Sequence, residues 1–232
     1  NQTLIVPPHS MIVVVAGSAY LDPEDAAWNP SITDAGRLWD TRVVARTPNP
    51  GTWMFDWYND SYSSVSVTFD VVFPVATYNP TVGFVVLAVT DTADPAVSPP
   101  DTVKMPLLSS DAGGPSAMAA TINSDAGDQT IMGFATYDTT EPVAATDNTL
   151  TTVNPKSVRL HSGEGYYGAI WRTNPGVGGN VLVGASSPAT SYGAVVAASY
   201  SPFVAPPPGP PIELEGGGFL LDENGANLLT EF

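Results

Sequence analysis

Ser64-Val-Ser-Val-Thr-Phe-Asp70 alternates strictly between polar and apolar side chains. Successive side chains of a β-strand point to opposite faces, so Val65, Val67 and Phe69 share one face and the polar residues share the other. This pattern is typical of an antiparallel strand with one face on a core and the other in water. The stretch therefore predicts a sheet that is half exposed.

Two other stretches, Met11-Ile-Val-Val-Val-Ala16 and Phe84-Val-Val-Leu-Ala-Val89, are apolar on both faces. They suit central strands or strands covered by a neighbouring subunit, and the sequence leaves both interpretations open. Met11–Ala16 is too short to span a bilayer and has no basic residue ahead of it. It also follows Pro7-Pro8, so it is interpreted as a buried strand rather than a signal sequence.

Strand patterns recur along the chain, and no window of a dozen residues has helical periodicity without an interrupting Gly or Pro. Many short strands separated by turn clusters predict an all-β fold, an antiparallel, jelly-roll-like β-sandwich over residues 1–201. The predicted strands are Leu4–Val6, Met11–Ala19, Arg42–Arg46, Ser64–Phe73, Thr81–Thr90, Ala117–Ile122, Thr130–Tyr137, Ser157–Leu160, Tyr166–Arg172, Asn180–Ala185 and Ala194–Tyr200. Pro74 marks an edge or a bulge.

The composition restricts the partners. Seven Lys and Arg against 23 Asp and Glu give the 232-residue chain a formal net charge of −16, which argues against nucleic acid or an anionic membrane as a partner. Charged residues make up only 13% of the chain, so Ser, Thr, Asn, Gly and Pro must cover the surface, as in extracellular particles and secreted modules. The absence of cysteine excludes disulfides, thiolate nucleophiles and cysteine zinc sites.

The end of the chain divides into a proline-rich linker at 202–211 and a tail at 212–232. The proline run favours polyproline II, which would hold the tail away from the body. The tail predicts a β-hairpin turned at Asn224-Gly225, and a lone hairpin is marginal in water. We therefore expect it to dock on a partner by β-augmentation. The docking residues would be Ile212, Leu214, Phe219, Leu220, Leu221, Leu228, Leu229 and Phe232.

Two parts of the chain resemble known families. Ile32-Thr-Asp-Ala-Gly-Arg-Leu-Trp39, Trp53-Met-Phe-Asp-Trp57 and the strand Ser64–Phe73 together resemble a β-sandwich module common in phage structural proteins and bacterial surface proteins. Gly217–Glu231 is similar to the Leu-Leu-x-Glu hairpin tags that end many tailed-phage virion proteins.

The resemblance implies a non-enzymatic structural protein on the outer surface of a tailed-bacteriophage virion. A capsid decoration or minor head protein is the first expectation, and a tail-surface protein is the alternative. Its partners would be capsid or tail proteins of the same virion, and it would form a homo-oligomer on the particle.

Several patterns with possible chemistry lack the context that the chemistry needs. Gly163-Glu-Gly-Tyr-Tyr-Gly168 matches GxGxxG, but a strand instead of a helix follows it, which favours a hairpin turn over a dinucleotide site. His9 and His161 have no GxSxG nucleophile elbow to accompany them. We therefore expect no catalytic residue and no cofactor.

Acidic residues give no clear site either. Loop acids could supply a carboxylate pair for glycoside hydrolysis, but the sequence does not give the distance between the two carboxylates. Loop acids could also supply oxygen ligands for calcium, but none of them fits an EF-hand loop. We interpret them as solvated charges and expect no metal. The acids are Asp22, Glu24, Asp25, Asp138, Glu141, Asp147 and Glu164.

Aromatic residues suggest the remaining alternative. Trp53, Phe55 and Trp57 alternate along a strand-like stretch and would form a ladder on one face. Such a ladder either packs in the core or stacks sugars, with Trp53 and Trp57 as glycan-stacking residues. The second reading would make the protein a carbohydrate-binding adhesion module, with a host surface glycan as its ligand. Trp39 and Trp171 are isolated and are expected in the core.

Overall fold

The structure, a computed structural model, consists of β-strands joined by turns and loops in every part of the chain that it describes. All strand pairings are antiparallel, so the all-β antiparallel prediction is confirmed. The described residues are 1–18, 29–46, 51–74, 82–107, 116–137, 143–144, 156–162, 165–174, 178–187, 192–205, 213–214 and 218–219.

The N-terminal half forms two sheets that pack face to face. The outer sheet has the order β1-β6-β3, and the inner sheet has the order β4-β5-β2-β7. The strands are β1 (Gln2–Val6), β2 (Ser10–Ser18), β3 (Ser31–Asp34), β4 (Asp40–Arg46), β5 (Gly51–Asn59), β6 (Val65–Val72) and β7 (Val82–Val89).

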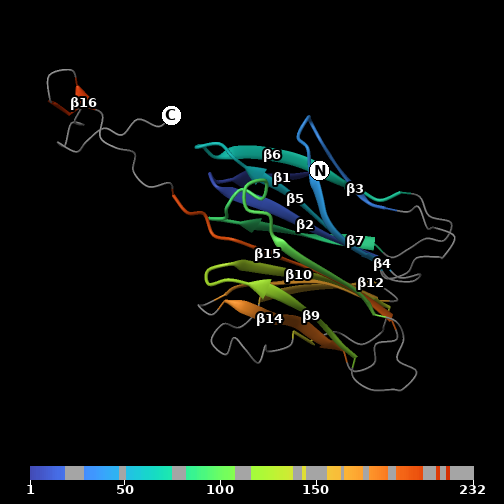
Figure 1. The fold of residues 1–232 in the computed structure, drawn as a ribbon. Helices are drawn as coiled ribbons and strands as arrows, with labels where there is room; N and C mark the ends of the chain where they lie inside the picture. The colour runs from blue at the N-terminus through green and yellow to red at the C-terminus, as the bar shows by residue number, and fades with distance from the viewer. Residues whose placement is uncertain are drawn as a thin grey trace.

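The second half adds two more sheets, so four layers lie one on another (Figure 1). Its inner sheet has the order β12-β13-β10-β15-β8, and its outer sheet has the order β11-β14-β9. The strands are β8 (Asp101–Leu107), β9 (Ser116–Ser124), β10 (Gln129–Tyr137), β11 (Val143–Ala144), β12 (Lys156–Ser162), β13 (Gly165–Thr173), β14 (Gly179–Ser187) and β15 (Tyr192–Tyr200). The sequence predicted a single sandwich over 1–201, whereas the structure stacks two; the jelly-roll detail stays a prediction.

The two halves repeat one topology. Adding eight to each strand number of the N-terminal sheets gives the strand order of the C-terminal sheets, with β8 as an extra edge strand. The two inner sheets then face each other, with β2 and β5 packed on β10 and β13. The fold therefore contains two sandwiches of the same topology. They pack through their inner sheets, as two subunits of a symmetric homodimer would.

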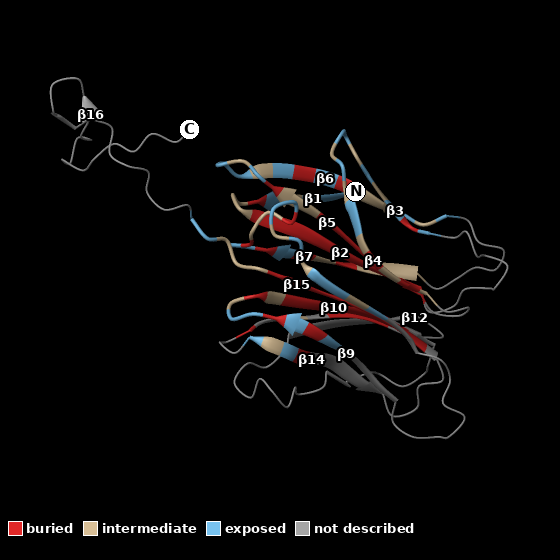
Figure 2. Cartoon of the chain, in the orientation of Figure 1, coloured by how far each residue is buried: buried red, intermediate tan, exposed pale blue. Residues whose placement is uncertain are grey.

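The two inner sheets explain the doubly apolar stretch Met11–Ala16, whereas Phe84–Val89 lies in the edge strand β7 and is only partly buried. All nine residues of β2 are buried (Figure 2), because the outer sheet covers Ile12, Val14 and Ala16 while the facing inner sheet covers Val13 and Val15. Of the two interpretations left open by the sequence, the central strand is correct for β2. Its second cover is the other half of the same chain.

Residues 65–70 of the alternating stretch lie in β6 and behave as predicted. Val67 and Phe69 are buried between the outer and inner sheets, whereas Ser66 and Thr68 are exposed. The strand ends at Val72, before Pro74.

The aromatic ladder lies in the core between the outer and inner N-terminal sheets. Trp53 is 1% exposed and its indole N–H donates to Asn29 Oδ1, so the glycan-stacking prediction is wrong for Trp53. Trp57 packs against the same cluster, and the Arg37 guanidinium carbon lies 5.4 Å from its ring centroid. Trp39 and Trp171 are partly buried against the two cores, as expected.

The inner sheets approach closely where the side chains are smallest. Val15 in β2 occupies the space above Gly133 in β10, and a Cβ added at Gly133 would overlap the Val15 side chain. Thr52 in β5 adds a polar link, because its hydroxyl donates to the Ala194 carbonyl at 3.1 Å. Close packing of the halves therefore depends on a glycine at position 133.

A buried carboxylate also joins the halves. Arg42 in β4 donates to both oxygens of Asp56 in β5, at 2.6 and 2.9 Å. The Tyr200 hydroxyl of β15 donates to the same carboxylate at 2.8 Å. Asp56 is 2% exposed, so this carboxylate is compensated by one partner from its own sheet and one from the facing sheet.

Gly133→Val is expected to destabilise the chain by about 1–3 kcal/mol, because the added methyl groups must displace Val15 in a packed core. Urea unfolding followed by tryptophan fluorescence measures the change. Ala88→Val, on the exposed side of β7, is the control and should shift the midpoint little. Equal midpoints for the two variants would contradict the close approach.

Tyr200→Phe is expected to make stability less sensitive to alkaline pH. Burial, and then the Asp56 charge, raise the pKa of Tyr200 well above its ordinary value of 10.0, so the folded chain holds this proton more tightly than the unfolded chain does. That contribution is complete below about pH 10 and is lost as the pH rises towards the folded pKa.

Urea midpoints between about pH 9 and 11 should thus fall less steeply in Tyr200→Phe than in the unaltered chain. At neutral pH the variant loses one hydrogen bond, which costs about 1–2 kcal/mol. Tyr62→Phe, at an exposed position, is the control. Identical pH slopes for Tyr200→Phe and the unaltered chain would refute this role.

Candidate functional site

Two equivalent turns meet at one end of the molecule, where the inner strands β2 and β10 begin. The β1–β2 turn contains Pro7-Pro8-His9, and His9 has a φ of 49°. The β9–β10 turn contains Asp125-Ala-Gly-Asp128, and Gly127 has a φ of 90°. A left-handed residue turns the chain sharply in each case, so both halves return to their inner sheets at the same end.

A buried asparagine fixes each turn. The Asn59 amide at the end of β5 donates to the Val6 carbonyl at 3.0 Å and to the Pro7 carbonyl at 2.8 Å. The Asn174 amide after β13 donates to the Ser124 carbonyl at 2.9 Å. Val6 and Ser124 are the last residues of β1 and β9, so the duplication extends to this hydrogen bond.

The segments that follow β7 and β15 pair with each other across the two halves. Thr92 is bridged to Pro202, the Ala93 N–H donates to the Ser201 carbonyl at 2.9 Å, and the Phe203 N–H donates to the Asp91 carbonyl at 2.8 Å. Pro202 and Phe203 therefore belong to the body. This corrects the predicted linker start at 202, because backbone pairing continues through 203.

The rings of His9 and Phe203 add a side-chain contact to this pairing. We call the paired segments 91–93 and 201–203, together with His9, the clamp. The two rings stack with centroids 3.8 Å apart and an interplanar angle of 11°. The Thr92 N–H donates to the His9 carbonyl at 2.9 Å, and the Tyr62 ring contacts the imidazole in a T-shaped arrangement with centroids 5.7 Å apart. The last described stretch of the body is thus held against the first turn of the chain.

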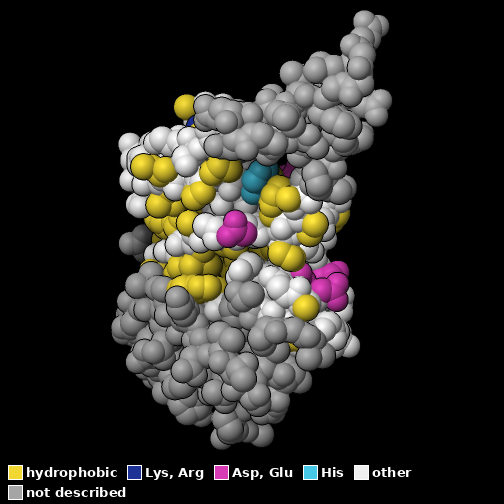
Figure 3. All heavy atoms as spheres, turned by 90° about the vertical axis from the view of Figure 1, so that its left-hand side faces the viewer, with side chains coloured by type: hydrophobic (Ala, Val, Ile, Leu, Met, Phe, Trp, Pro, Cys, Tyr) yellow, Lys and Arg dark blue, Asp and Glu magenta, His cyan; other side chains and the backbone are white. Residues whose placement is uncertain are grey.

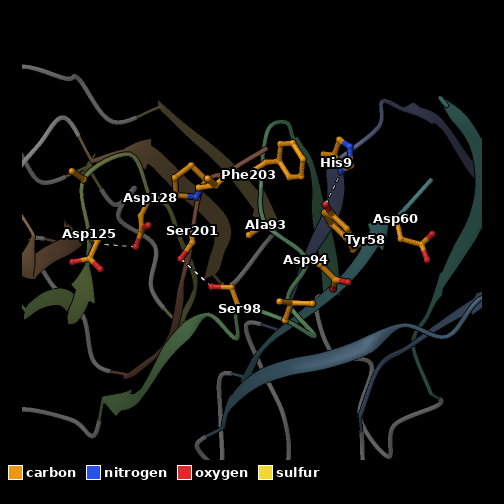
Figure 4. Close-up of a pocket in the computed structure, with 14 residues that line it drawn as sticks. His9, Tyr58, Asp60, Ala93, Asp94, Ser98, Asp125, Asp128, Ser201 and Phe203 are labelled. Atoms are coloured by element: carbon orange, nitrogen blue, oxygen red, sulfur yellow. Dashed lines mark hydrogen bonds between the residues drawn. The ribbon is translucent and has the colours of Figure 1, made fainter. Parts of the chain in front are cut away.

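A cavity of about 580 Å³ opens beside the clamp, and we call it the end pocket. Figure 3 views this end, where histidine and acidic side chains lie among apolar ones, and Figure 4 shows the pocket itself. It is lined by His9, Tyr58, Asp60, Ala93, Asp94, Val97, Ser98, Asp125, Ala126, Asp128, Ser201, Pro202, Phe203 and Val204. Both halves contribute to it, so neither sandwich alone would form it.

The end pocket is acidic. Asp60 and Asp94 come from the N-terminal half, Asp125 and Asp128 come from the C-terminal half, and none of the described lining residues is Lys or Arg. Burial, and then the charges of Asp94 and Asp60, raise the pKa of Tyr58, whose hydroxyl lies 3.4 Å from His9 Nδ1. The arrangement favours a positively charged ligand group.

Asp128 has one carboxylate oxygen that no described residue contacts by a hydrogen bond. Its Oδ2 accepts from the Asp125 N–H at 2.9 Å and from the Ser199 hydroxyl at 3.0 Å. Its Oδ1 is buried and has no hydrogen-bond partner among the described residues, and the residue is 6% exposed. A buried anionic oxygen without a donor is costly, and two hydrogen bonds to the other oxygen of the same carboxylate offset part of that cost.

The described residues include no group of three or more His, Asp or Glu side chains arranged to hold a metal ion. All the loop acids considered in the sequence lie outside the described residues. His161 lies in β12, opposite Tyr166. Residues 165–168 of the GxGxxG match begin β13, which pairs with β12 through Ser162 and Gly165, so a strand instead of a helix follows the match, as predicted.

Only two of the predicted docking residues fall in described structure. Leu214 lies in β16 (Glu213–Leu214) and Phe219 in β17 (Gly218–Phe219), which pair with each other. The other six docking residues and the predicted turn at Asn224-Gly225 lie outside the described residues.

No family model, curated protein or solved structure matches the chain. The described part of the chain contains no helix with the length and hydrophobicity needed to cross a membrane.

The sequence interpretation missed the end pocket. The chain has 23 acidic residues, and the four in the pocket come from one turn and two loops that are brought together only when the two halves stack. The signal that could have located it is local: His9 follows two prolines just before a fully apolar strand, a position where a turn must end.

Phe203→Ala should loosen the clamp without unfolding the sandwiches. Loss of the stacked ring should raise the rate of hydrogen exchange at the Thr92 and Ala93 amides by about tenfold, because the free energy of local opening falls by about 1.4 kcal/mol. Exchange measured by mass spectrometry on peptides covering 90–95 tests this. Val204→Ala, at a side chain 79% exposed, is the control. Unchanged exchange in Phe203→Ala would show that the backbone bonds suffice.

Proposed function

We propose that the chain is a non-enzymatic structural protein of a tailed-phage virion, a capsid decoration or minor head protein that docks on neighbouring subunits through residues 212–232. The observation that carries the proposal is the clamp at Phe203, which ties the exit point of the linker to both halves of the body. A segment that binds a neighbour needs such a fixed origin.

The clamp connects the start of the linker to a fully buried stretch of the body. Residues 193–200 of β15 are all buried, and Phe203 follows three residues after this strand. Force on the linker would therefore act on backbone pairing and on ring stacking before it reached the core strands. This suits a protein held on a particle by its terminal segment.

The tail has the composition of a docking segment. Its apolar side chains recur in short runs, so main-chain pairing to a neighbour's sheet edge would supply affinity and pockets for these side chains would supply specificity. Many copies on a symmetric lattice would reinforce each weak contact through effective concentration. A tail-surface location uses the same mechanism and differs only in the neighbour.

The carbohydrate-binding alternative loses one of its two residues, because Trp53 is enclosed between two sheets, and Trp57 is partly buried against the same cluster. The assembly role needs no such exposed aromatic. We therefore retain assembly as the single proposed function.

Deleting residues 213–232 should abolish addition of the purified chain to virus particles that lack it, measured by co-sedimentation. The body should keep its urea midpoint, because the clamp and both sandwiches end before residue 206. A full-length Leu38→Asp variant, changed at a body side chain 92% exposed, is the control and should still bind. Binding by the truncated chain would move the interface to the sandwiches and overturn the docking role.

A further inference from the structure

Strand β7 is an open edge of the N-terminal inner sheet. It pairs with β2 on one side and with no other strand of the described chain on the other side. Its eight residues, Val82–Val89, run as Val-Gly-Phe-Val-Val-Leu-Ala-Val, without a charge or a proline. The free N–H and C=O groups of such an edge can pair with an added strand, and proteins normally protect their edges against this.

The other edges of the two inner sheets carry such protection. β4 has a bulge between Thr41 and Val43 and contains two arginines. β8 contains a lysine and a proline, and β12 contains a lysine and an arginine. Bulges, prolines and charges all oppose the addition of a further strand. Among the described edge strands of the inner sheets, β7 alone lacks all three.

The second half of the chain shows what this position binds. The equivalent of β7 there is β15, which pairs with β10 on one side and with β8, antiparallel, on the other. All residues from 193 to 200 of β15 are buried, whereas five of the eight residues of β7 are partly or fully exposed. An antiparallel strand equivalent to β8 would therefore complete the edge of β7.

The chain contains a counterpart of β8. β8 follows β7 after eleven residues, 90–100, which end in Pro99-Pro100. Ile212 follows β15 after eleven residues, 201–211, which end in Pro210-Pro211. The clamp pairs the first residues of these two connections with each other, so both cross between the halves at one point. Residues 212–218 thus hold the position after β15 that β8 holds after β7.

The two segments also share a side-chain pattern. In β8, Val103 is half-buried, and its two neighbours, a threonine and a lysine, are exposed. The equivalent residue of the tail is Leu214, and its two neighbours are glutamates. Alternation in an added strand would place the leucine on one face of the sheet and both glutamates on the other.

The register of β8 predicts the register of the tail. β8 begins opposite Ser199, the last residue but one of β15. The same register on β7 places Ile212 opposite Ala88 and Leu214 opposite Val86. Ala88 is exposed and Val86 is half-buried, so both have surface available for this contact.

The surface beside β7 has room for the strand. A groove of about 340 Å³ lies beside residues 86–90 and reaches Ile131 and Trp171 of the facing sheet. None of its described lining residues is charged, so an acidic chain meets no like charge there. Further along, Gly216 would lie opposite the half-buried Phe84, and an aromatic ring packs well over an edge glycine.

The linker favours a neighbouring copy over the same chain as the acceptor. Residues 90–100 contain three prolines, whereas residues 201–211 contain six, which extends this connection as polyproline II. β16 pairs with β17 and lies apart from the body (Figure 1). That two-residue pairing is marginal and can open for a longer one. Exchange of an identical element between copies is a low-cost route to assembly.

We propose that residues 212–218 of one copy add as an antiparallel strand to β7 of a neighbouring copy, an inference that rests on the proposed docking role of residues 212–232. Main-chain pairing supplies the affinity, and Ile212 and Leu214 supply the specificity. Each copy has one such arm and one such edge, so the contact joins copies head to tail, as a ring or a lattice requires.

Engineered disulfides test the register, because the chain has no cysteine of its own. Full-length Ala88→Cys is mixed with full-length Ile212→Cys and oxidised with copper phenanthroline. Opposite residues of an antiparallel pair lie within disulfide range, so mass spectrometry should find a peptide that joins positions 88 and 212. Ala88→Cys mixed with Glu213→Cys is the matched control. Its yield should be about tenfold lower, because residue 213 would point to the opposite face.

Sedimentation velocity on full-length chains tests the edge without cysteines. The unaltered chain should associate as its concentration rises, and Ala88→Asp should weaken association by about tenfold, because a charge on an edge opposes pairing. Leu38→Asp, at a side chain 92% exposed, is the control and should associate like the unaltered chain. Equal association by the two variants would overturn the β7 site, and urea midpoints verify that both fold.

A chain that carries both Ala88→Cys and Ile212→Cys separates the two possible acceptors. Disulfide-linked dimers and larger species would support exchange between copies. An intramolecular disulfide at every dilution, with no link between the mixed single variants, would show that the tail closes on its own body and would overturn the proposal. Absence of the 88–212 link in both experiments would overturn it too.

Particle binding distinguishes this inference from the docking role on which it rests. If deletion of 213–232 abolishes particle binding while no 88–212 link forms, the tail docks on a different virion protein and only this inference fails. If the link forms while the deleted chain still adds to particles, the copies exchange strands and the docking role fails.

Discussion

The two-sided burial of β2 is the constraint on which the rest of the structure depends. A strand with no wet face needs a sheet on each side, and one seven-stranded sandwich provides only one. The second half of the chain provides the other through the equivalent face of its own inner sheet. The duplication is thus energetically coupled: exposing either inner sheet would uncover the apolar face of both.

The duplication also explains how similar halves produce a site that is not symmetric. The asparagines after β5 and β13 repeat the same hydrogen bond, yet the turns that they hold differ: one carries His9 and the other carries Asp125 and Asp128. The two equivalent turns thus place an imidazole ring from one half and carboxylates from the other half at the same end of the molecule. Divergence of side chains on a preserved backbone is sufficient to build a pocket with distinct subsites.

The sequence predicted strands better than their assembly. Alternation in Ser64–Asp70 and continuous apolarity in Met11–Ala16 report the local environment of a strand, and both were correct. The stacking of two sandwiches depends instead on which faces meet, and Gly133 shows why that is hidden: a glycine inside a strand looks unfavourable until Val15 is seen to fill its space. Trp53 shows a second limit of the sequence. Alternation placed it on the same face as Phe55 and Trp57, but it did not determine whether that face was buried or exposed to solvent.

Charge links the end pocket to the tail that leaves the body beside it. Residues 206–232 contain five acids and no base, and the chain enters this segment next to Phe203 and Val204, which line a pocket with four aspartates. Like charges within a Debye length of about 8 Å at physiological salt repel, so folding back of the tail into the pocket is disfavoured. The proline run restricts the same return by stiffness. Both effects act against occupation of the end pocket by the chain's own acidic C-terminal segment.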